Sequence, residues 1–139
     1  MSETIAENNA PKRTFADASL VKSVALPNAD TVTESIDLKT AANKQRLEGV
    51  EIVLQIQVPA GDSGPGAGSL AVDIGHGTSG SPRSTLLLDA EAIGNADVGP
   101  LGYRVAVPLP DLGTDTYIGL SITATGDWSS YTAEFGVAT

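Results

Sequence analysis

The stretch that decides the fold is "EIVLQIQV", residues 51–58, in which apolar side chains occupy every second position. Successive side chains of a β-strand point to opposite faces, so this alternation predicts a strand with one buried face. The buried positions are Ile52, Leu54, Ile56 and Val58, and the positions between them are Glu51, Val53, Gln55 and Gln57. Because most of the intervening residues are polar, we expect the back of this strand to be solvated or lightly covered.

The same period of two continues along the chain in both directions. The segments are "SLVKSVAL" (19–26), "TVTESIDL" (31–38), "SLAVDIG" (69–75), "STLLLDA" (84–90), "GYRVAVPL" (102–109), "TYIGLSITA" (116–124) and "YTAEFGV" (131–137). Segments rich in glycine and proline separate them, among them "GHGTSGSPRS" (75–84). The stretch "KTAANKQRLEG" (39–49) suits either a helix or a loop. We therefore predict an all-β protein, an antiparallel β-sandwich or jelly roll of about eight strands.

The strand pattern also predicts which side chains face the core. Leu86 and Leu88 should share one face of their strand, whereas Lys22 and Glu34 each interrupt an otherwise apolar face. A chain of 139 residues suits a single domain. We assign residues 17–139 to this domain and residues 1–16, which are polar and aperiodic, to an N-terminal arm that is flexible alone or ordered against a neighbour.

Charge is distributed unevenly along the chain. Up to Arg46 there are 6 basic and 6 acidic residues, whereas from Leu47 onward 2 basic residues stand against 11 acidic ones, which accounts for the net charge of −9. An acidic body argues against direct binding of nucleic acid or of an anionic membrane. The basic residues of the first third either dock onto an acidic partner or form an ordinary mixed-charge surface. No signal peptide or membrane-spanning helix is expected.

The segment "DIGHGTSGS" (73–81) resembles, in its "GHGT" and "GTS" parts, the catalytic segments of subtilisin-type proteases. A triad needs a nucleophile, a base and a buried carboxylate that orients the base. Ser79 lies three residues from His76, and Asp73 points outward on the strand pattern, so we expect a glycine-rich turn with an exposed histidine rather than an active site. The chain has one histidine and no cysteine. We predict no enzymatic activity, metal or cofactor.

Other candidate sites also have simpler readings. Asp111 and Asp115, like Asn95 and Asp97, lack the dense spacing of a calcium loop and suit turns. Glu51 and Glu134 lie on the outward faces of two strands, where nothing places them together as a glycosidase needs.

Trp128, in "TGDWSS", precedes the last strand. It is either an exposed platform for a sugar or partner, or a ring folded over the open end of the sandwich.

The C-terminal stretch "YRVAVPLPDLGTDTYIGLSITATGDWSSYTAEFGVA" (103–138) resembles the jelly-roll capsid cement, or decoration, proteins of tailed bacteriophages. The matching pieces are the proline-bounded turn at Val107–Pro110, the strand Tyr117–Gly126 closed by glycine, and the small-residue strand Ser130–Ala138. By pattern the resemblance covers Val32 to Ala138.

This resemblance implies a homotrimer on the outer surface of a virion, bound to the major capsid protein and stabilising the shell against packaged DNA. Residues 1 to about 26 would be the clamp. The contact residues it implies are Pro11, Lys12, Arg13, Phe15, Lys22 and Trp128. The alternative is a small binding module, lectin-like or fibre-associated, that uses its end loops and Trp128.

Overall fold

The structure, a computed structural model, describes residues 5–7, 21–38, 51–57, 68–94, 97–98 and 102–138. These residues form nine strands and, within these ranges, no helix long and apolar enough to cross a membrane. The strands are β1 (Ile5–Glu7), β2 (Val21–Ala25), β3 (Thr31–Asp37), β4 (Glu51–Gln57), β5 (Ser69–Thr78), β6 (Ser81–Gly94), β7 (Tyr103–Pro108), β8 (Tyr117–Thr125) and β9 (Thr132–Ala138). The stretch 39–49, expected as a helix or loop, lies outside the described residues.

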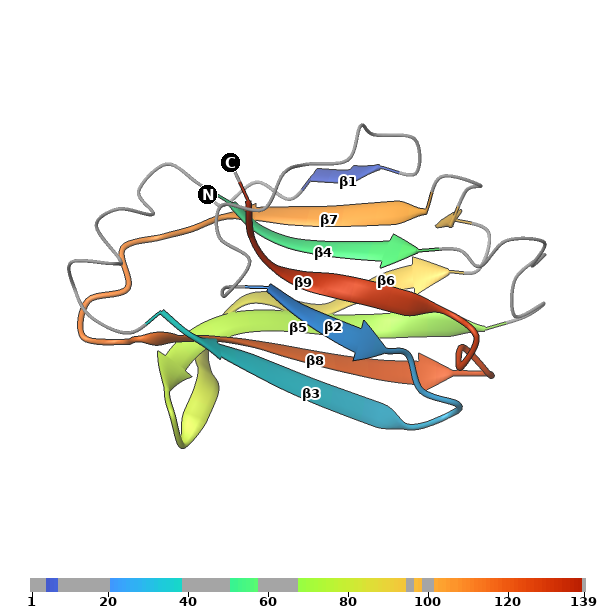
Figure 1. The fold of residues 1–139 in the computed structure, drawn as a ribbon, viewed down its shortest axis with the longest axis horizontal. Helices are drawn as coiled ribbons and strands as arrows, with labels where there is room; N and C mark the ends of the chain where they lie inside the picture. Colours follow the sequence, from blue (N-terminus) through green and yellow to red (C-terminus); the bar gives the residue numbers. More distant parts are fainter. Residues whose placement is uncertain are drawn as a thin grey trace.

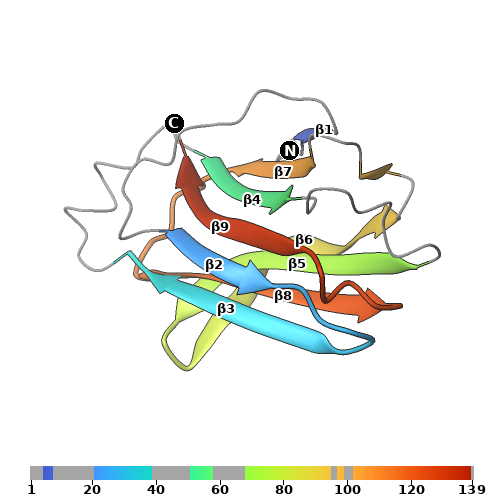
Figure 2. The same ribbon diagram turned by 45° about the vertical axis from the view of Figure 1, so that its right-hand side comes forward.

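The strands form two antiparallel sheets that pack face to face, which confirms the predicted β-sandwich (Figure 1). The five-stranded sheet has the order β1-β7-β4-β9-β2, and the four-stranded sheet has the order β3-β8-β5-β6. From β2 onward the first strand pairs with the last, β3 with β8, β4 with β7 and β5 with β6. This nested pairing is the topology of an eight-stranded jelly roll. Figure 2 shows the two layers from a second angle.

β1 is an addition to the jelly roll. It pairs antiparallel with β7 through Ile5↔Ala106, Ala6↔Val105 and Glu7↔Arg104. The expected N-terminal arm therefore contributes three residues to a sheet of the domain that follows it. β1 occupies the edge of the five-stranded sheet opposite to β2.

The predicted alternation accounts for most of the core. Inward-facing residues of β4, β7, β8 and β9 are buried as expected. They are Ile52, Leu54, Ile56, Val105, Val107, Ile118, Leu120, Ile122, Ala124, Ala133, Phe135 and Val137. With few aromatic residues, the core is filled mainly by branched aliphatic side chains, which suit a pleated surface.

The back of β4 differs from the prediction. Val53 and Gln55 point away from the core, yet both are buried, as are Arg104 and Ala106 on the neighbouring strand β7. The expected solvated or lightly covered back is therefore wrong. A period of two reports which side chains share a face, but it does not report what covers that face.

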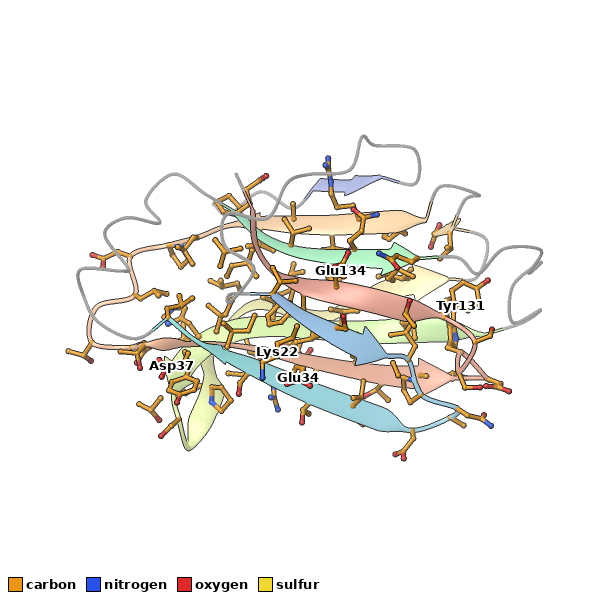
Figure 3. The ribbon with its side chains drawn as sticks, in the orientation of Figure 1. Lys22, Glu34, Asp37, Tyr131 and Glu134 are labelled. Atoms are coloured by element: carbon orange, nitrogen blue, oxygen red, sulfur yellow. The ribbon has the colours of Figure 1, made fainter. Side chains whose placement is uncertain are left out.

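The two polar interruptions of the strand pattern pair with each other. Lys22 on β2 and Glu34 on β3 belong to the adjacent edges of the two sheets, and Lys22 Nζ lies 3.9 Å from Glu34 Oε1 (Figure 3). Charged side chains at sheet edges hinder pairing with other chains. Because the pair is solvent-exposed, its contribution to stability is about 1 kcal/mol or less.

The connection between β5 and β6 is shorter than predicted. β5 continues through His76 to Thr78, and only Ser79 and Gly80 form the turn. The prediction that "GHGTSGSPRS" separates two strands along its whole length is therefore wrong. The glycines serve close backbone approach instead. A Cβ at Gly75 would lie 2.4 Å from the carbonyl oxygen of Thr85, and one at Gly77 would overlap the carbonyl oxygen of Ser81.

Register shifts in this hairpin also move Leu86. Leu88 pairs with Ile74 and is buried, whereas Leu86 pairs with Gly75 and is 43% exposed. The prediction that these two leucines share a face is therefore wrong. Between these two pairs, β5 advances by one residue while β6 advances by two, as in a β-bulge. This irregularity turns Leu86 to the opposite face.

Candidate functional site

His76 is held by a carboxylate, although not by the one nearest in sequence. Its Nδ1 lies 2.7 Å from Asp115 Oδ2, and the two residues are 39 positions apart. His76 comes from β5, and Asp115 comes from the connection between β7 and β8. His76 is 8% exposed, so the expectation of an exposed histidine is wrong. The pair ties the β5–β6 hairpin to the segment just before the start of β8.

Among the described residues, the serines near this pair in sequence do not complete a triad with it. Ser84 Oγ donates to the backbone carbonyl oxygen of His76 at 3.4 Å, which directs this hydroxyl toward the main chain. Ser79 lies in the exposed two-residue turn. Asp73 points outward, as predicted, and its Oδ1 accepts the N–H of Ala90 at 2.6 Å. A carboxylate-bound imidazole is one half of an acid–base device, but it needs a hydroxyl at its other nitrogen to act in acyl transfer.

The four-stranded sheet presents a hydroxyl-lined surface on its outer face. Four exposed threonines lie on two neighbouring strands, and we call them the threonine face: Thr31 and Thr33 of β3, and Thr123 and Thr125 of β8. Thr31 pairs with Thr123, and their Oγ1 atoms lie 3.0 Å apart. The half-buried Ser121 lies beside Thr33 in the next row. Thus two adjacent strands display hydroxyls at every outward position over this area.

The opposite end of the same outer face is covered by β6. A Cβ at Gly119 would lie 2.6 Å from Cγ of Arg83 and 2.8 Å from the carbonyl oxygen of Pro82. Gly119 pairs with Gly75, so two glycines side by side make room for the start of β6. The outer face is therefore divided into a covered end, near His76, and an open end formed by the threonine face.

Trp128 belongs to the core. It is fully buried, its Nε1 donates to the carbonyl oxygen of Thr125 at 3.2 Å, and its ring meets Tyr131 edge-to-face with centroids 5.3 Å apart. Tyr131 closes the same end of the sandwich (Figure 3). The prediction that Trp128 contacts a sugar or a capsid is therefore wrong, because a ring without exposed surface cannot stack on a ligand. The alternative reading, a ring folded over the open end, is confirmed.

The other expected contact residues fall into two groups. Lys22 is described, with a side chain that is 51% exposed and close to Glu34. Pro11, Lys12, Arg13 and Phe15 lie outside the described residues.

The acidic candidates behave mostly as turn residues. Asp111 Oδ1 accepts the N–H of Gly113 at 3.0 Å, and Asp97 Oδ2 accepts the N–H of Gly94 at 2.7 Å. Among the described parts of the chain, no three His, Asp or Glu residues are grouped as metal ligands. Glu134 accepts a hydrogen bond from Gln57 and pairs across the sheet with Gln55, four residues along β4 from Glu51.

Two features of this region differ from the sequence-based expectations. The sequence predicts Asp115 only as a turn residue, because a contact across 39 positions leaves no local signal. The threonine face did leave a signal, since "TVT" (31–33) and "SITAT" (121–125) place hydroxyls at alternate positions. The inward residues of these segments predict the core, whereas the outward residues form the exposed surface.

Comparisons with known proteins give only distant likenesses. No protein-family model and no curated protein matches the sequence. Among solved structures, the chain is similar to a carbohydrate-binding module of the β-sandwich superfamily, at 15% identity and a TM-score of 0.48, covering 99% of this chain and 56% of that one. It is also similar to part of xylanase 10C from Cellvibrio japonicus in complex with xylopentaose, at 12% identity and a TM-score of 0.44, covering 99% of this chain and 26% of that one. The chain thus spans about half and a quarter of these neighbours. Neither likeness carries a ligand over to it.

Proposed function

We propose that this protein is a non-enzymatic binding module and that the threonine face is its contact surface. The observation that carries the proposal is the side-by-side placement of four exposed threonines on β3 and β8. Their positions are fixed by backbone pairing on a rigid sheet, so the hydroxyls are preorganised for a ligand.

The chemistry of this face suits a neutral, hydroxyl-rich ligand such as a polysaccharide. A threonine hydroxyl both donates and accepts hydrogen bonds, which matches the mixed donors and acceptors of a sugar. The net charge of −9 disfavours anionic ligands. Because Trp128 is buried, we assign ligand contact to the open end of the four-stranded sheet and not to the end loops and the tryptophan.

A glycan array followed by calorimetry on the best ligand tests this proposal. The double variant Thr33→Ala and Thr123→Ala removes two hydroxyls from the face. Because alanine is smaller than threonine, neither substitution introduces a steric clash. Loss of two hydrogen bonds at about 0.5–1.5 kcal/mol each lowers affinity roughly 5- to 150-fold.

The matched control is the double variant Thr78→Ala and Thr114→Ala, which removes the hydroxyls of two other exposed threonines that lie outside the face. It should bind as the unmodified chain does. Equal binding by both double variants, or no glycan binding by the unmodified chain, contradicts the proposal. Thermal unfolding of each variant separates lost binding from lost folding.

A capsid shell is the second candidate partner, favoured by the segregation of charge along the chain. Six of the eight basic residues lie within the first 46 positions, next to an acidic body. A cement protein of this kind would contact the shell through the basic residues of its clamp, residues 1 to about 26, and would turn its acidic body outward. It rests on the resemblance and on this charge distribution.

Co-sedimentation with capsids tests the second candidate. Because Ile5–Glu7 form β1, truncating the whole arm would also uncover the edge of β7. Charge reversal by Lys12→Glu and Arg13→Glu leaves β1 in place and should reduce co-sedimentation at least tenfold. Normal decoration by this variant, with Lys39→Glu and Lys44→Glu as the matched control, counts against an arm-mediated contact.

A further inference from the structure

β1 is attached to a jelly roll that is complete without it. The eight strands β2–β9 account for both sheets, and β1 lies outside them on the edge strand β7. It pairs with only Arg104, Val105 and Ala106 of the six residues of β7. We propose that β1 is an exchangeable strand: in an oligomer, β1 of one copy pairs with β7 of the next copy. This inference is independent of the ligand of the threonine face.

The sheet order supports exchange. All four neighbouring pairs in the order β1-β7-β4-β9-β2 are antiparallel, so β1 and β2 run in the same direction at opposite edges. Consecutive strands usually lie side by side, whereas here three strands separate them. The two edges are four strand spacings apart, about 19 Å. Following the registers across the sheet, Ile5 is level with Val21 and Glu7 is level with Ser23, so within one chain the end of β1 and the start of β2 lie at opposite edges of the sheet.

The length of chain between these strands permits either arrangement. Residues 8–20 separate β1 from β2, and thirteen residues span at most roughly 45 Å when extended. That reach is more than twice the roughly 19 Å between the two edges, so the connection also leaves length for pairing with a second copy. A strand of three residues also makes few hydrogen bonds, so it can leave its own edge more readily than a long strand.

The receiving edge gives exchange a structural purpose. β7 without β1 would present an open edge, and open edges promote uncontrolled pairing with other chains. Donation of β1 from each copy to another closes either as a reciprocal dimer about a two-fold axis or as a ring of more copies. The occupant of the β7 edge is thus the segment Ile5–Glu7 of a second copy.

Disulfide trapping distinguishes exchange from pairing within one chain. The natural chain has no cysteine, so introduced thiols are the only ones present. One preparation carries Ile5→Cys and another carries Ala106→Cys, at positions that are Cα partners across β1 and β7. Such antiparallel partners lie about 4.5–5.5 Å apart, within the range that a disulfide spans. The two preparations are unfolded together, refolded at equal amounts and oxidised.

Exchange predicts a covalent dimer of the two different chains on a non-reducing gel, in at least tenfold excess over a mixture of Ile5→Cys with Thr78→Cys. A single chain carrying both Ile5→Cys and Ala106→Cys should give covalent oligomers. A monomer closed by an internal disulfide, without a dimer in the mixture, overturns the proposal. So does the absence of any cross-link in either sample.

A second measurement avoids mutation of the buried Ala106. Isotope-labelled and unlabelled natural chains are refolded together, and filtered NOEs between backbone protons of β1 and β7 are recorded. Exchange predicts such NOEs between labelled and unlabelled copies. A monomer by sedimentation, or β1–β7 NOEs confined to one copy, overturns the proposal even if the cysteine variants fail to fold.

Discussion

At the scale of single residues, Trp128 shows how burial decides a role. Its indole is enclosed and its N–H is satisfied by Thr125, so it stabilises the end of the sandwich. As the chain has one tryptophan, its fluorescence reports this site alone. We expect blue-shifted native emission that iodide does not quench, and a red-shifted, quenchable emission after unfolding. Quenching of the folded protein at the rate of free tryptophan would show that the ring is exposed.

The His76–Asp115 pair is the second feature at this scale. Asp115→Ala removes the partner of a nearly buried imidazole nitrogen, and leaving such a group unsatisfied costs about 1–3 kcal/mol. Urea unfolding should show a loss of this size. Asp89→Ala, at an exposed position of β6, is the control and should change the free energy of unfolding by less than about 0.5 kcal/mol. Equal effects of the two substitutions would mean that the pair adds no stability.

At the scale of elements, the glycines of the β5–β6 hairpin have distinct roles. A Cβ at Gly75 would lie 2.4 Å from a backbone oxygen of β6, whereas one at Gly80 meets nothing within 4 Å. We expect Gly75→Ala to destabilise the fold by about 1–3 kcal/mol through overpacking, and Gly80→Ala to be nearly neutral. Chemical unfolding of both variants measures the difference. If Gly75→Ala is as stable as Gly80→Ala, the close approach of the two strands is wrong.

The turn between β8 and β9 contains a titratable cap. Hydrogen bonds from the hydroxyl and the backbone N–H of Ser129 hold the pKa of Asp127 below its ordinary value of 3.8. A lowered folded pKa favours folding above pH 3.8, and this contribution is lost as the pH falls through the folded pKa. NMR titration of the Asp127 carboxyl should give a midpoint below 3.8. Ser129→Ala should raise this midpoint, whereas Ser130→Ala should not.

The strands were predictable where one face is wholly apolar, and unpredictable where pairing depends on distant backbone. Alternation identified β8 and β9 because their inward residues repeat without interruption over 118–124 and 133–137. It failed at the end of β5, where Gly75 and Gly77 allow contacts with β6 that only the folded hairpin creates. It also gave no sign of β1, whose three residues are too few for a period. The role of Asp115 was also unpredictable, because its partner His76 is 39 positions away in the sequence.

At the scale of the whole molecule, the excess of acidic residues is the property that distinguishes the body of the protein. Of the residues from Leu47 onward, 11 are acidic and 2 are basic. Both basic residues are at least half-buried, Arg83 over Gly119 and Arg104 on β7. This leaves carboxylates to dominate the surface potential of the described sheets, and it disfavours association with anionic partners.

This acidity should be measurable at Tyr103. Partial burial raises the pKa of its phenol above the ordinary value of 10.0, and the negative charges of Asp97 and then Glu91 raise it further. Folding therefore favours the neutral phenol. The resulting stability is present below pH 10.0 and is lost as the pH rises through the folded pKa. Alkaline titration of phenolate absorbance, with Tyr103→Phe subtracted to isolate this residue, should give a midpoint above 10.0.

Salt separates the two causes of this shift. At about 1 M salt the screening length is roughly 3 Å, so the contributions of Asp97 and Glu91 should largely vanish. Desolvation is insensitive to salt, and as the largest cause it should keep the midpoint above 10.0. At low salt, Glu91→Gln should lower the Tyr103 midpoint, as added salt does, whereas Glu134→Gln on β9 should not change it. A midpoint at 10.0 in low salt would contradict both burial and the acidic surroundings, and a shift unaffected by salt would leave burial as its sole cause.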